Sequence, residues 1–515
     1  MTEYTCKRII LLSLPKPDLK DNTGDADRLV GALKKKSGCE NVFIDLDLLR
    51  KIPALLREYD YTVRCIVCRE GKGLSLLGLT SGEEKRIAAG LAVDLGTTRV
   101  VLRLLDLASG DVLGESAFDN PQISVAPDIL ARIHFSDREG GLEKLQQMVI
   151  GQLNRSLSEL CASCSLSTED VYLLALAGNT AMTHLFMGIT PHWMIREPYI
   201  PAVNNPGFLR TSELGIAAAS HARIFIFPNV GSYFGGDLLA GILFSGMNQM
   251  EDTAILVDVG TNAEVILGNK DWLVACAGAA GPALESGVAR MGMMAGPGVI
   301  DSVEVDRESR EFRFHTIDNL PPKGMCGSGI IDLAAHLFLS GMMDIRGRLV
   351  PEKCGRHLTE KDGMPFIVVV PADKSASGDD LGMSQADIDS LIRSKAAMYT
   401  ILRTLTRTVG MEPEELRKFY VAGTFGSFIK PRSAIAIGMI PDLPPESYKP
   451  LGNSSLGGAA LALMTEDILK ESEKIRNRIT YIELNVNQEL MLRFSAAKFL
   501  PHTDPGRFPS VKVWG

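Results

Sequence analysis

The sequence lacks three features that would place a 515-residue protein in a familiar functional class. It has no apolar run of the roughly 18 residues that a membrane-spanning helix needs, and its first residues lack the apolar core of a signal peptide. Its net charge is −8, whereas general nucleic-acid binders usually carry a basic face. It also has no G-x-x-x-x-G-K-S/T loop, so the P-loop nucleotide-binding class has no support. We therefore expect a soluble cytoplasmic protein that binds neither nucleic acid nor a membrane.

Cysteine is scarce and scattered. The chain has nine cysteines, an odd number that is typical of reduced cytosolic thiols rather than of a disulfide framework. Two C-x-x-C pairs, Cys65/Cys68 and Cys161/Cys164, have the local spacing of zinc or iron–sulfur ligands. Because 93 positions (161 minus 68) separate the pairs, we do not expect them to share a metal.

The sequence does contain one strand-and-turn pattern that occurs twice. An apolar run ends at Asp94 and meets Gly96-Thr97-Thr98, and a second run ends at Asp258 and meets Gly260-Thr261-Asn262, followed by Glu264. A single copy is an ordinary β-hairpin pattern. Two copies in matching strand contexts, 164 positions apart (258 minus 94), indicate a duplicated domain.

The composition of these two hairpins fits a metal polyphosphate. Glycine lets the backbone approach a ligand, successive N–H groups and hydroxyls surround an anion, and an aspartate at a strand end holds a cation. Two such hairpins that face each other would form a clamp. We therefore assign Asp94 and Asp258 to the metal ion and the turn residues to phosphate binding. The turn residues are Gly96, Thr97, Thr98, Gly260, Thr261 and Asn262.

The chain is longer than one hydrophobic core usually holds, so several domains are expected. Residues 1–88 are predicted to form a small α/β domain, 89–248 and 249–470 two larger lobes, and 471–515 a strand and helix that pack back on the lobes. The expected elements of the small domain are strands at 9–14 and 61–67 and helices at 25–36 and 46–59.

Several predicted strands end in a polar or glycine-rich turn that begins a helix, as in α/β proteins that direct backbone amides at a ligand. Gly178-Asn179-Thr180 follows a strand at 171–177, and His184 on the next helix is interpreted as a packed core histidine. Asp237 lies at another helix start, and its interpretation as an N-cap or as a carboxylate facing the cleft stays open. Gly327-Ser328 begins a further apolar helix.

Three motifs resemble those of a known superfamily. Asp94-Leu95-Gly96-Thr97-Thr98, Asp258-Val259-Gly260-Thr261-Asn262 and Ala422-Gly423-Thr424-Phe425-Gly426 are similar to the first phosphate, second phosphate and adenosine motifs of the acetate and sugar kinase, Hsp70 and actin superfamily. The resemblance implies an α/β fold with duplicated ribonuclease-H-like lobes around an ATP cleft, a small N-terminal α/β domain beside them, and ATP with Mg²⁺ as ligands. It implies catalytic roles for Asp94 and Asp258, which hold the metal through water, and for Asp237 or Glu264, which orients the attacking water. The further ATP-binding residues that it implies are Gly327, Ser328, Gly423, Thr424 and Gly426.

Other motifs narrow the resemblance. They are Asn120-Pro121-Gln122, Gly178-Asn179-Thr180 with Met182-Thr183-His184-Leu185, the segment 281–298, Cys326-Gly327-Ser328-Gly329-Ile330 and Ile437-Gly438-Met439-Ile440-Pro441. Together they look like the reductive activators of corrinoid proteins, over nearly the whole chain. This resemblance implies ATP-dependent reduction of Co(II) to Co(I) for methyl transfer, with a corrinoid protein or corrinoid-dependent methyltransferase as partner.

The start of the chain departs from that family. Its members typically carry a [2Fe–2S] domain, held by closely spaced cysteines, ahead of the small α/β domain. Here Met1 begins directly on the small domain and Cys6 stands alone. Either the domain has been removed or the protein depends on a separate donor. We therefore expect no [2Fe–2S] cluster in this chain, an external ferredoxin-type electron donor as partner, and either a monomer or a homodimer.

Two other functions fit the same fold, because a fold does not fix the acceptor. The first is a small-molecule kinase that acts on a carboxylate or a sugar. The second is an assembly ATPase that only binds partners. Phosphoryl transfer to small acceptors, compared with stimulation by a corrinoid protein, distinguishes the three.

Overall fold

The computed structural model describes residues 8–83, 86–259, 263–278, 288–423, 430–482 and 488–513. The chain divides into two compact units, one formed by Met1–Phe244 with Ser454–Arg478 and the other by Ser245–Asn453 with Ile479–Gly515. Among the described residues, no helix is both long and apolar enough to cross a bilayer. The domain boundaries expected at 88, 248 and 470 stay predictions.

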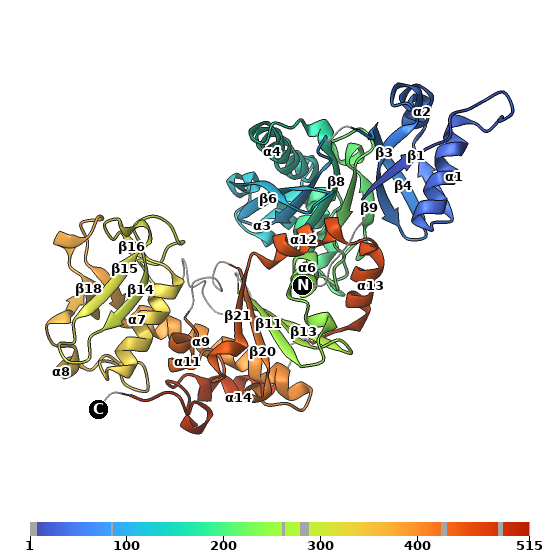
Figure 1. Ribbon diagram of the computed structural model, residues 1–515. Coiled ribbons are helices and arrows are strands. Elements are labelled where there is room, and N and C mark those ends of the chain that lie inside the picture. Colours follow the sequence, from blue (N-terminus) through green and yellow to red (C-terminus); the bar gives the residue numbers. More distant parts are fainter. Residues whose placement is uncertain are drawn as a thin grey trace. The chain divides into compact units, whose positions relative to one another are not determined.

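The first unit begins with a four-stranded sheet in the order β1-β3-β4-β2. Its strands are β1 (Ile9–Ser13), β2 (Asn41–Ile44), β3 (Thr62–Glu70) and β4 (Gly73–Ser81), and its helices are α1 (Asp25–Ser37) and α2 (Leu46–Glu58) (Figure 1). Both predicted helices are confirmed to within one residue. Strands β2 and β4 were not expected; in β4 the alternation of leucine with polar residues or glycine breaks between Leu76 and Leu77, where the register with β3 shifts.

A six-stranded sheet in the order β7-β6-β5-β8-β10-β9 forms the core of the first unit. The strands are β5 (Ala89–Leu95), β6 (Arg99–Asp106), β7 (Val112–Asp119), β8 (Val171–Gly178), β9 (Gly207–Arg210) and β10 (Arg223–Ile226). Strands β5, β6 and β7 form an antiparallel meander, and β8 and β10 continue the sheet parallel to β5.

Helices α4 (Gly141–Ser163) and α5 (Thr180–Met187) pack on one face of this sheet, and α12 (Ser454–Met464) packs on the other (Figure 1). The other helices are α3 (Ile129–Ser136), α6 (Gly236–Ser245) and α13 (Ile468–Arg478). In α4, Leu145, Val149, Leu153 and Leu157 recur every four residues and pack with the odd-numbered side chains of β5. The even-numbered face of β5 meets α12, since a Cβ on Gly90 would lie 3.1 Å from the Leu463 side chain.

The second unit is built on a six-stranded sheet in the order β21-β20-β11-β12-β13-β22. The strands are β11 (Ala254–Val259), β12 (Ala263–Gly268), β13 (Leu273–Gly278), β20 (Lys418–Ala422), β21 (Tyr448–Gly452) and β22 (Ile479–Tyr481). Strands β11, β12 and β13 again form an antiparallel meander, and β20 and β21 run parallel to β11. The two sheets therefore share one topology, with β5 equivalent to β11 and β8 to β20. This repeat confirms the predicted duplication and the α/β fold class.

Two three-stranded sheets and several helices complete the second unit. The strands are β14 (Val299–Val305), β15 (Phe312–Thr316), β16 (Gly324–Met325), β17 (Leu358–Lys361), β18 (Met364–Val370) and β19 (Leu381–Ser384). The helices are α7 (Gly327–Leu339), α8 (Pro351–Cys354), α9 (Gln385–Thr408), α11 (Pro431–Ala436) and α14 (Gln488–Ala497).

The C-terminal segment is held against α9 by buried polar groups. The Lys395 ammonium group is fully buried and donates to the carbonyl oxygens of Phe499 and Pro501 at 2.5 and 2.8 Å. His502 accepts a hydrogen bond from the Asp504 N–H through Nδ1 at 3.0 Å. Burial, and after it the positive charge of Lys395, lowers the pKa of His502 from 6.5 to about 4.

We expect this histidine to make the fold sensitive to acid. Below pH 6.5 His502 binds a proton in the unfolded chain, whereas in the folded protein it stays neutral down to about pH 4. The free energy of unfolding therefore decreases as the pH falls through this range. The slope is at most about 1.4 kcal/mol per pH unit. Calorimetry of the wild type and His502→Gln at pH 7 and pH 5 should show a smaller drop in melting temperature for the variant. Equal drops would contradict the assignment.

Candidate nucleotide site

Asp94 is the last polar residue of β5 and is half-buried. It lies opposite Val101 on β6 and beside Ala177 on β8. Its Oδ1 accepts a hydrogen bond from the Ser455 hydroxyl at 2.8 Å, across 361 sequence positions. Since Ser455 is the second residue of α12 and is 7% exposed, the start of this helix fixes the carboxylate at the end of the central strand.

The carbonyl oxygens of the turn after Asp94 accept hydrogen bonds from Asn120 and Arg132. Asn120 donates its side-chain amide to Gly96 O at 3.0 Å and its backbone N–H to Thr98 O at 2.7 Å. Arg132 is completely buried and donates to Thr97 O at 2.8 Å. Burial lowers the pKa of Arg132 to about 10, so the group remains cationic at neutral pH. A buried positive charge therefore lies directly behind the predicted phosphate turn.

Two further helix starts meet this turn at the carboxyl ends of the parallel strands. Asn179 caps α5 by accepting from the Met182 N–H at 3.0 Å, and its amide donates to the Thr97 hydroxyl at 3.1 Å. A Cβ on Gly235 would lie 2.5 Å from both the Asn179 Cα and the Asp237 Oδ1, so only glycine permits this approach. Asp94, the Gly96–Thr98 turn and Asp237 thus lie together at the carboxyl ends of the parallel strands, where α/β proteins bind ligands.

Asp237 lies inside the first turn of α6 rather than before it. Its Oδ1 accepts from the Leu238 N–H at 2.9 Å, and the residue is half-buried. The side chain therefore accepts from an N–H at the start of the helix, and the interpretations as an N-cap and as a carboxylate facing the cleft both stay open. The position of Asp237 beside Asn179 leaves its proposed catalytic role as a prediction.

The Gly96 turn gives a direct test of the site. A Cβ at this position would lie 2.2 Å from the Arg99 carbonyl oxygen, so Gly96→Ala forces the backbone to move, at a cost of about 1–3 kcal/mol. We expect the displaced turn to lose most of the thermal stabilisation by MgATP. The matched control is Gly151→Ala in α4, where a Cβ meets nothing within 4 Å. Retention of the full MgATP shift in Gly96→Ala would remove this turn from the site.

In the second unit, Asp258 on β11 lies directly opposite Glu264 on β12 and beside Ala422 on β20. Both carboxylates are half-buried. Like charges directly opposite each other destabilise a sheet, and a bound cation relieves their repulsion. The first hairpin has Val101 at the equivalent place, so this acidic pair is particular to the second copy.

Several predicted ATP-binding residues of the second unit lie outside the described residues, namely Gly260, Thr261, Asn262, Thr424 and Gly426. Gly423 is described and has φ +80°, a conformation that favours glycine at the end of β20. Gly327 and Ser328 form the first turn of α7, as predicted. The Ser328 hydroxyl is buried and donates to Asp301 O at 2.8 Å, and the ATP-binding role of Gly327 and Ser328 stays a prediction.

Sequence reasoning missed three side chains that shape these sites. Ser455 fixes Asp94, and Arg132 lies behind the first turn. In the second unit, Lys430 forms an ion pair at 2.9 Å with Asp332 of α7, which is 1% exposed, and donates to the Ser302 hydroxyl at 2.6 Å. The sequence Gly452-Asn453-Ser454-Ser455 indicates a helix start, but it does not show that Ser455 contacts Asp94.

The cysteine and histidine candidates are packed in cores. Cys65 belongs to the core of the small sheet and Cys161 to the core beneath α4, and burial raises their pKa values to about 12 and about 11. Burial thus disfavours the thiolate that binds metals. No group of three or more metal-binding side chains occurs among the described residues. His184 is fully buried, with Nδ1 at 2.7 Å from Thr180 O and Nε2 accepting from Val203 N–H, which confirms it as a core histidine.

Comparison with known proteins matches the chain in three consecutive segments. Residues 7–86 match the RACo linker region, 89–250 the RACo middle region, and 252–512 the C-terminal domain of RACo, the ASKHA domain. The ASKHA match confirms the predicted superfamily fold.

Two named relatives and one solved structure are similar to most of the chain. The corrinoid activation enzyme RamQ of Eubacterium limosum is 29% identical over 85% of this chain and 77% of its own length. A Co(II) methylated amine-specific corrinoid protein reductase of Methanosarcina barkeri is 23% identical over 76% of this chain and 73% of its own length. The solved structure of a reductive activator for corrinoid, iron–sulfur protein matches 98% of this chain and 80% of that chain, at 35% identity and a TM-score of 0.86. The chain therefore belongs to the RACo family.

Proposed function

We propose that this chain is an ATP-dependent reductive activator of a corrinoid protein, which couples binding and hydrolysis of MgATP to the reduction of Co(II) to Co(I) for methyl transfer. The observation that carries this proposal is the match of 98% of the chain to a reductive activator at 35% identity. The duplicated Asp–turn hairpins supply the nucleotide chemistry that such a reaction requires.

The energetic demand explains why ATP is needed. Co(II) gains one electron to become Co(I), and for a one-electron couple each tenfold bias corresponds to about 59 mV. A protein state that favours one cobalt form roughly 10⁴-fold shifts the potential by about 240 mV. A conformational change on binding MgATP would supply such a bias by changing the surface presented to the corrinoid partner.

The described residues fit a metal nucleotide. Asp94 and Asp258 would hold Mg²⁺, and the adjacent acidic pair of Asp258 and Glu264 favours a cation at the second hairpin. When bound, Mg²⁺ neutralises part of the phosphate charge. The Gly96–Thr98 turn binds phosphate oxygens, with the buried Arg132 charge behind it. Asp237 or Glu264 orients the attacking water, and the register opposite Asp258 favours Glu264.

In our proposal the electron comes from a separate donor protein and not from this chain. A ferredoxin-type protein gives one electron to the Co(II) corrinoid on the partner protein, and hydrolysis of ATP to ADP and phosphate resets the activator. We keep the oligomeric state open between a monomer and a homodimer.

The test is to measure ATP hydrolysis by the purified chain with three additions: a Co(II) corrinoid protein, acetate, and glucose. We expect slow hydrolysis alone, faster release of phosphate with the corrinoid protein, and no phosphorylated product from acetate or glucose. Formation of acetyl phosphate or a sugar phosphate would support the kinase alternative and contradict the proposal. Unchanged hydrolysis with every tested corrinoid protein would also contradict it.

A further inference from the structure

A pocket of about 540 Å³ lies along β1 in the first unit, remote in sequence from the nucleotide motifs. Its walls include Arg8, the first residues of β1 from Ile9 to Leu11, Lys36 at the end of α1, Arg69 of β3 and Glu466 just after α12. Its volume lies within the range of roughly 300–1,000 Å³ that is typical of ligand sites.

One wall of this pocket is the edge of a sheet. Among the described strands, β1 pairs only with β3. The Val67 N–H donates to Arg8 O and the Leu14 N–H to Tyr61 O, so the even-numbered residues of β1 bond to β3. In an antiparallel ladder the alternate residues, Ile9, Leu11 and Ser13, then direct their N–H and C=O groups at the other edge. The bond from the Lys36 ammonium to Leu11 O at 3.0 Å agrees with this direction.

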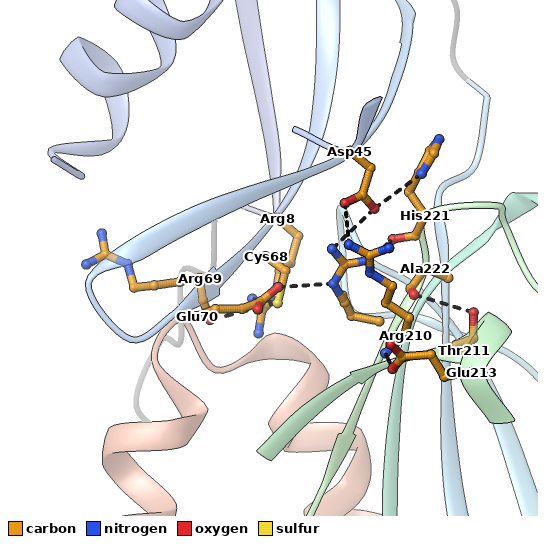
Figure 2. A network of polar contacts seen from close by, with 11 residues as sticks. Arg8, Asp45, Cys68, Arg69, Glu70, Arg210, Thr211, Glu213, His221 and Ala222 are labelled. Atoms are coloured by element: carbon orange, nitrogen blue, oxygen red, sulfur yellow. Dashed lines mark hydrogen bonds and ion pairs between the residues drawn. The ribbon is translucent and has the colours of Figure 1, made fainter. Parts of the chain in front are cut away.

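The cationic side chains of Arg8, Lys36 and Arg69 line the pocket beside this edge. Lys34, Lys35 and Lys36 are exposed in the last turn of α1, and Arg69 extends away from the ion pairs of Asp45 (Figure 2). Glu466, which pairs with Arg69 at 3.0 Å, is the acidic residue of the pocket wall. The chain as a whole carries −8, so this group of cations is opposite in sign to the net charge of the protein and favours an acidic partner.

The floor of the pocket is connected to the nucleotide site. Arg8 is 2% exposed and donates to three carbonyl oxygens at the end of α12, those of Leu463, Ala462 and Thr465, at 2.8, 3.3 and 2.5 Å. The other end of the same helix supplies Ser455 to Asp94. Eleven residues of α-helix, about 16 Å long, therefore join the pocket to the first phosphate turn.

From these contacts we propose that the open edge of β1 is a docking site for an acidic, extended segment of a protein partner, which adds a strand to the small sheet. Main-chain hydrogen bonds to Ile9 and to the Leu11 N–H provide the affinity, since Lys36 already donates to the Leu11 carbonyl oxygen, and the lysines of α1 select acidic side chains. Its occupancy is linked to MgATP binding through Arg8 and α12, and this linkage rests on the proposed function.

The probe is a fluorescent eight-residue peptide of alternating valine and glutamate, with blocked ends, measured by anisotropy without nucleotide. The control peptide alternates valine and lysine. We expect the acidic peptide to bind, and to slow hydrogen exchange at the amides of Ile9 and Leu11. Lys36→Glu should weaken binding at least about tenfold, whereas Lys51→Glu, an exposed lysine on α2 outside the pocket, should not. Equal binding of the two peptides, equal effects of the two variants, or no binding at about 1 mM peptide would overturn the docking site.

The linkage is tested by repeating the titration with saturating MgATP, whose binding is checked independently by the melting temperature. We expect the peptide affinity to change at least about threefold. An unchanged affinity in protein that shows the MgATP shift overturns the linkage while the docking site stands. Absence of any MgATP shift contradicts the proposed function and the linkage together, and the nucleotide-free titration still decides the docking site.

Discussion

Asp258→Asn is expected to reduce MgATP hydrolysis at least about 100-fold without loss of stability. The variant keeps the shape of the side chain but removes one charge assigned to Mg²⁺. Because Asp258 lies opposite Glu264 on the neighbouring strand, the same change also removes a repulsion between like charges. We therefore expect a melting temperature without nucleotide that is equal to or above that of the wild type.

The matched control is Asp252→Asn, an exposed acidic residue just before β11. It should hydrolyse ATP at the wild-type rate. Hydrolysis by Asp258→Asn that equals that of the control would remove Asp258 from the metal site. A large loss of stability in Asp258→Asn would show that its charge is structural.

Arg223→Met is expected to destabilise the first unit by about 3 kcal/mol. Arg223 lies on β10, is 8% exposed, and forms ion pairs with Glu70 at 3.3 Å and Asp45 at 3.4 Å. Asp45 also contacts Arg210 and His221, so it joins the small sheet to β9 and β10 (Figure 2). Loss of Arg223 removes the buried cation that two half-buried carboxylates, Glu70 and Asp45, share.

Arg210→Met provides the comparison, since Arg210 contacts the same Asp45 at 3.0 Å but its side chain is 54% exposed. Exposed ion pairs contribute below about 1 kcal/mol. Urea unfolding of the two variants should give clearly different midpoints, with Arg223→Met the lower. Equal midpoints would show that the network contributes little to the attachment of the small sheet.

The fold was predictable where local periodicity decided it. The two helices of the small sheet have regular apolar patterns, and the repeated Asp–turn hairpins revealed the duplication before any contact was known. Strand β4 was missed because its alternation is interrupted between Leu76 and Leu77, where the register with β3 shifts. The packing of α12 on β5 was also missed, since nothing in a local window shows that residue 455 returns to residue 94.

The site was predictable in part for a similar reason. Asp94 and Asp258 stand at equivalent strand ends, so the sequence repeat identified them as a pair. Glu264 was named from its place after the second turn, and the register adds that it lies opposite Asp258. Arg132 and Ser455 escaped notice because an arginine in an amphipathic helix is usually exposed and a serine at a helix start usually caps it. Their roles depend on contacts between distant segments.

Formation of Co(I) tests most directly whether MgATP drives the activation of a corrinoid. The measurement is an anaerobic visible spectrum of a Co(II) corrinoid protein with this chain and a reduced ferredoxin-type donor, recorded before and after addition of MgATP. We predict that Co(I) accumulates only after MgATP is added, and that Asp258→Asn prevents it. Equal Co(I) formation before MgATP addition, or full formation with the variant, would contradict this mechanism.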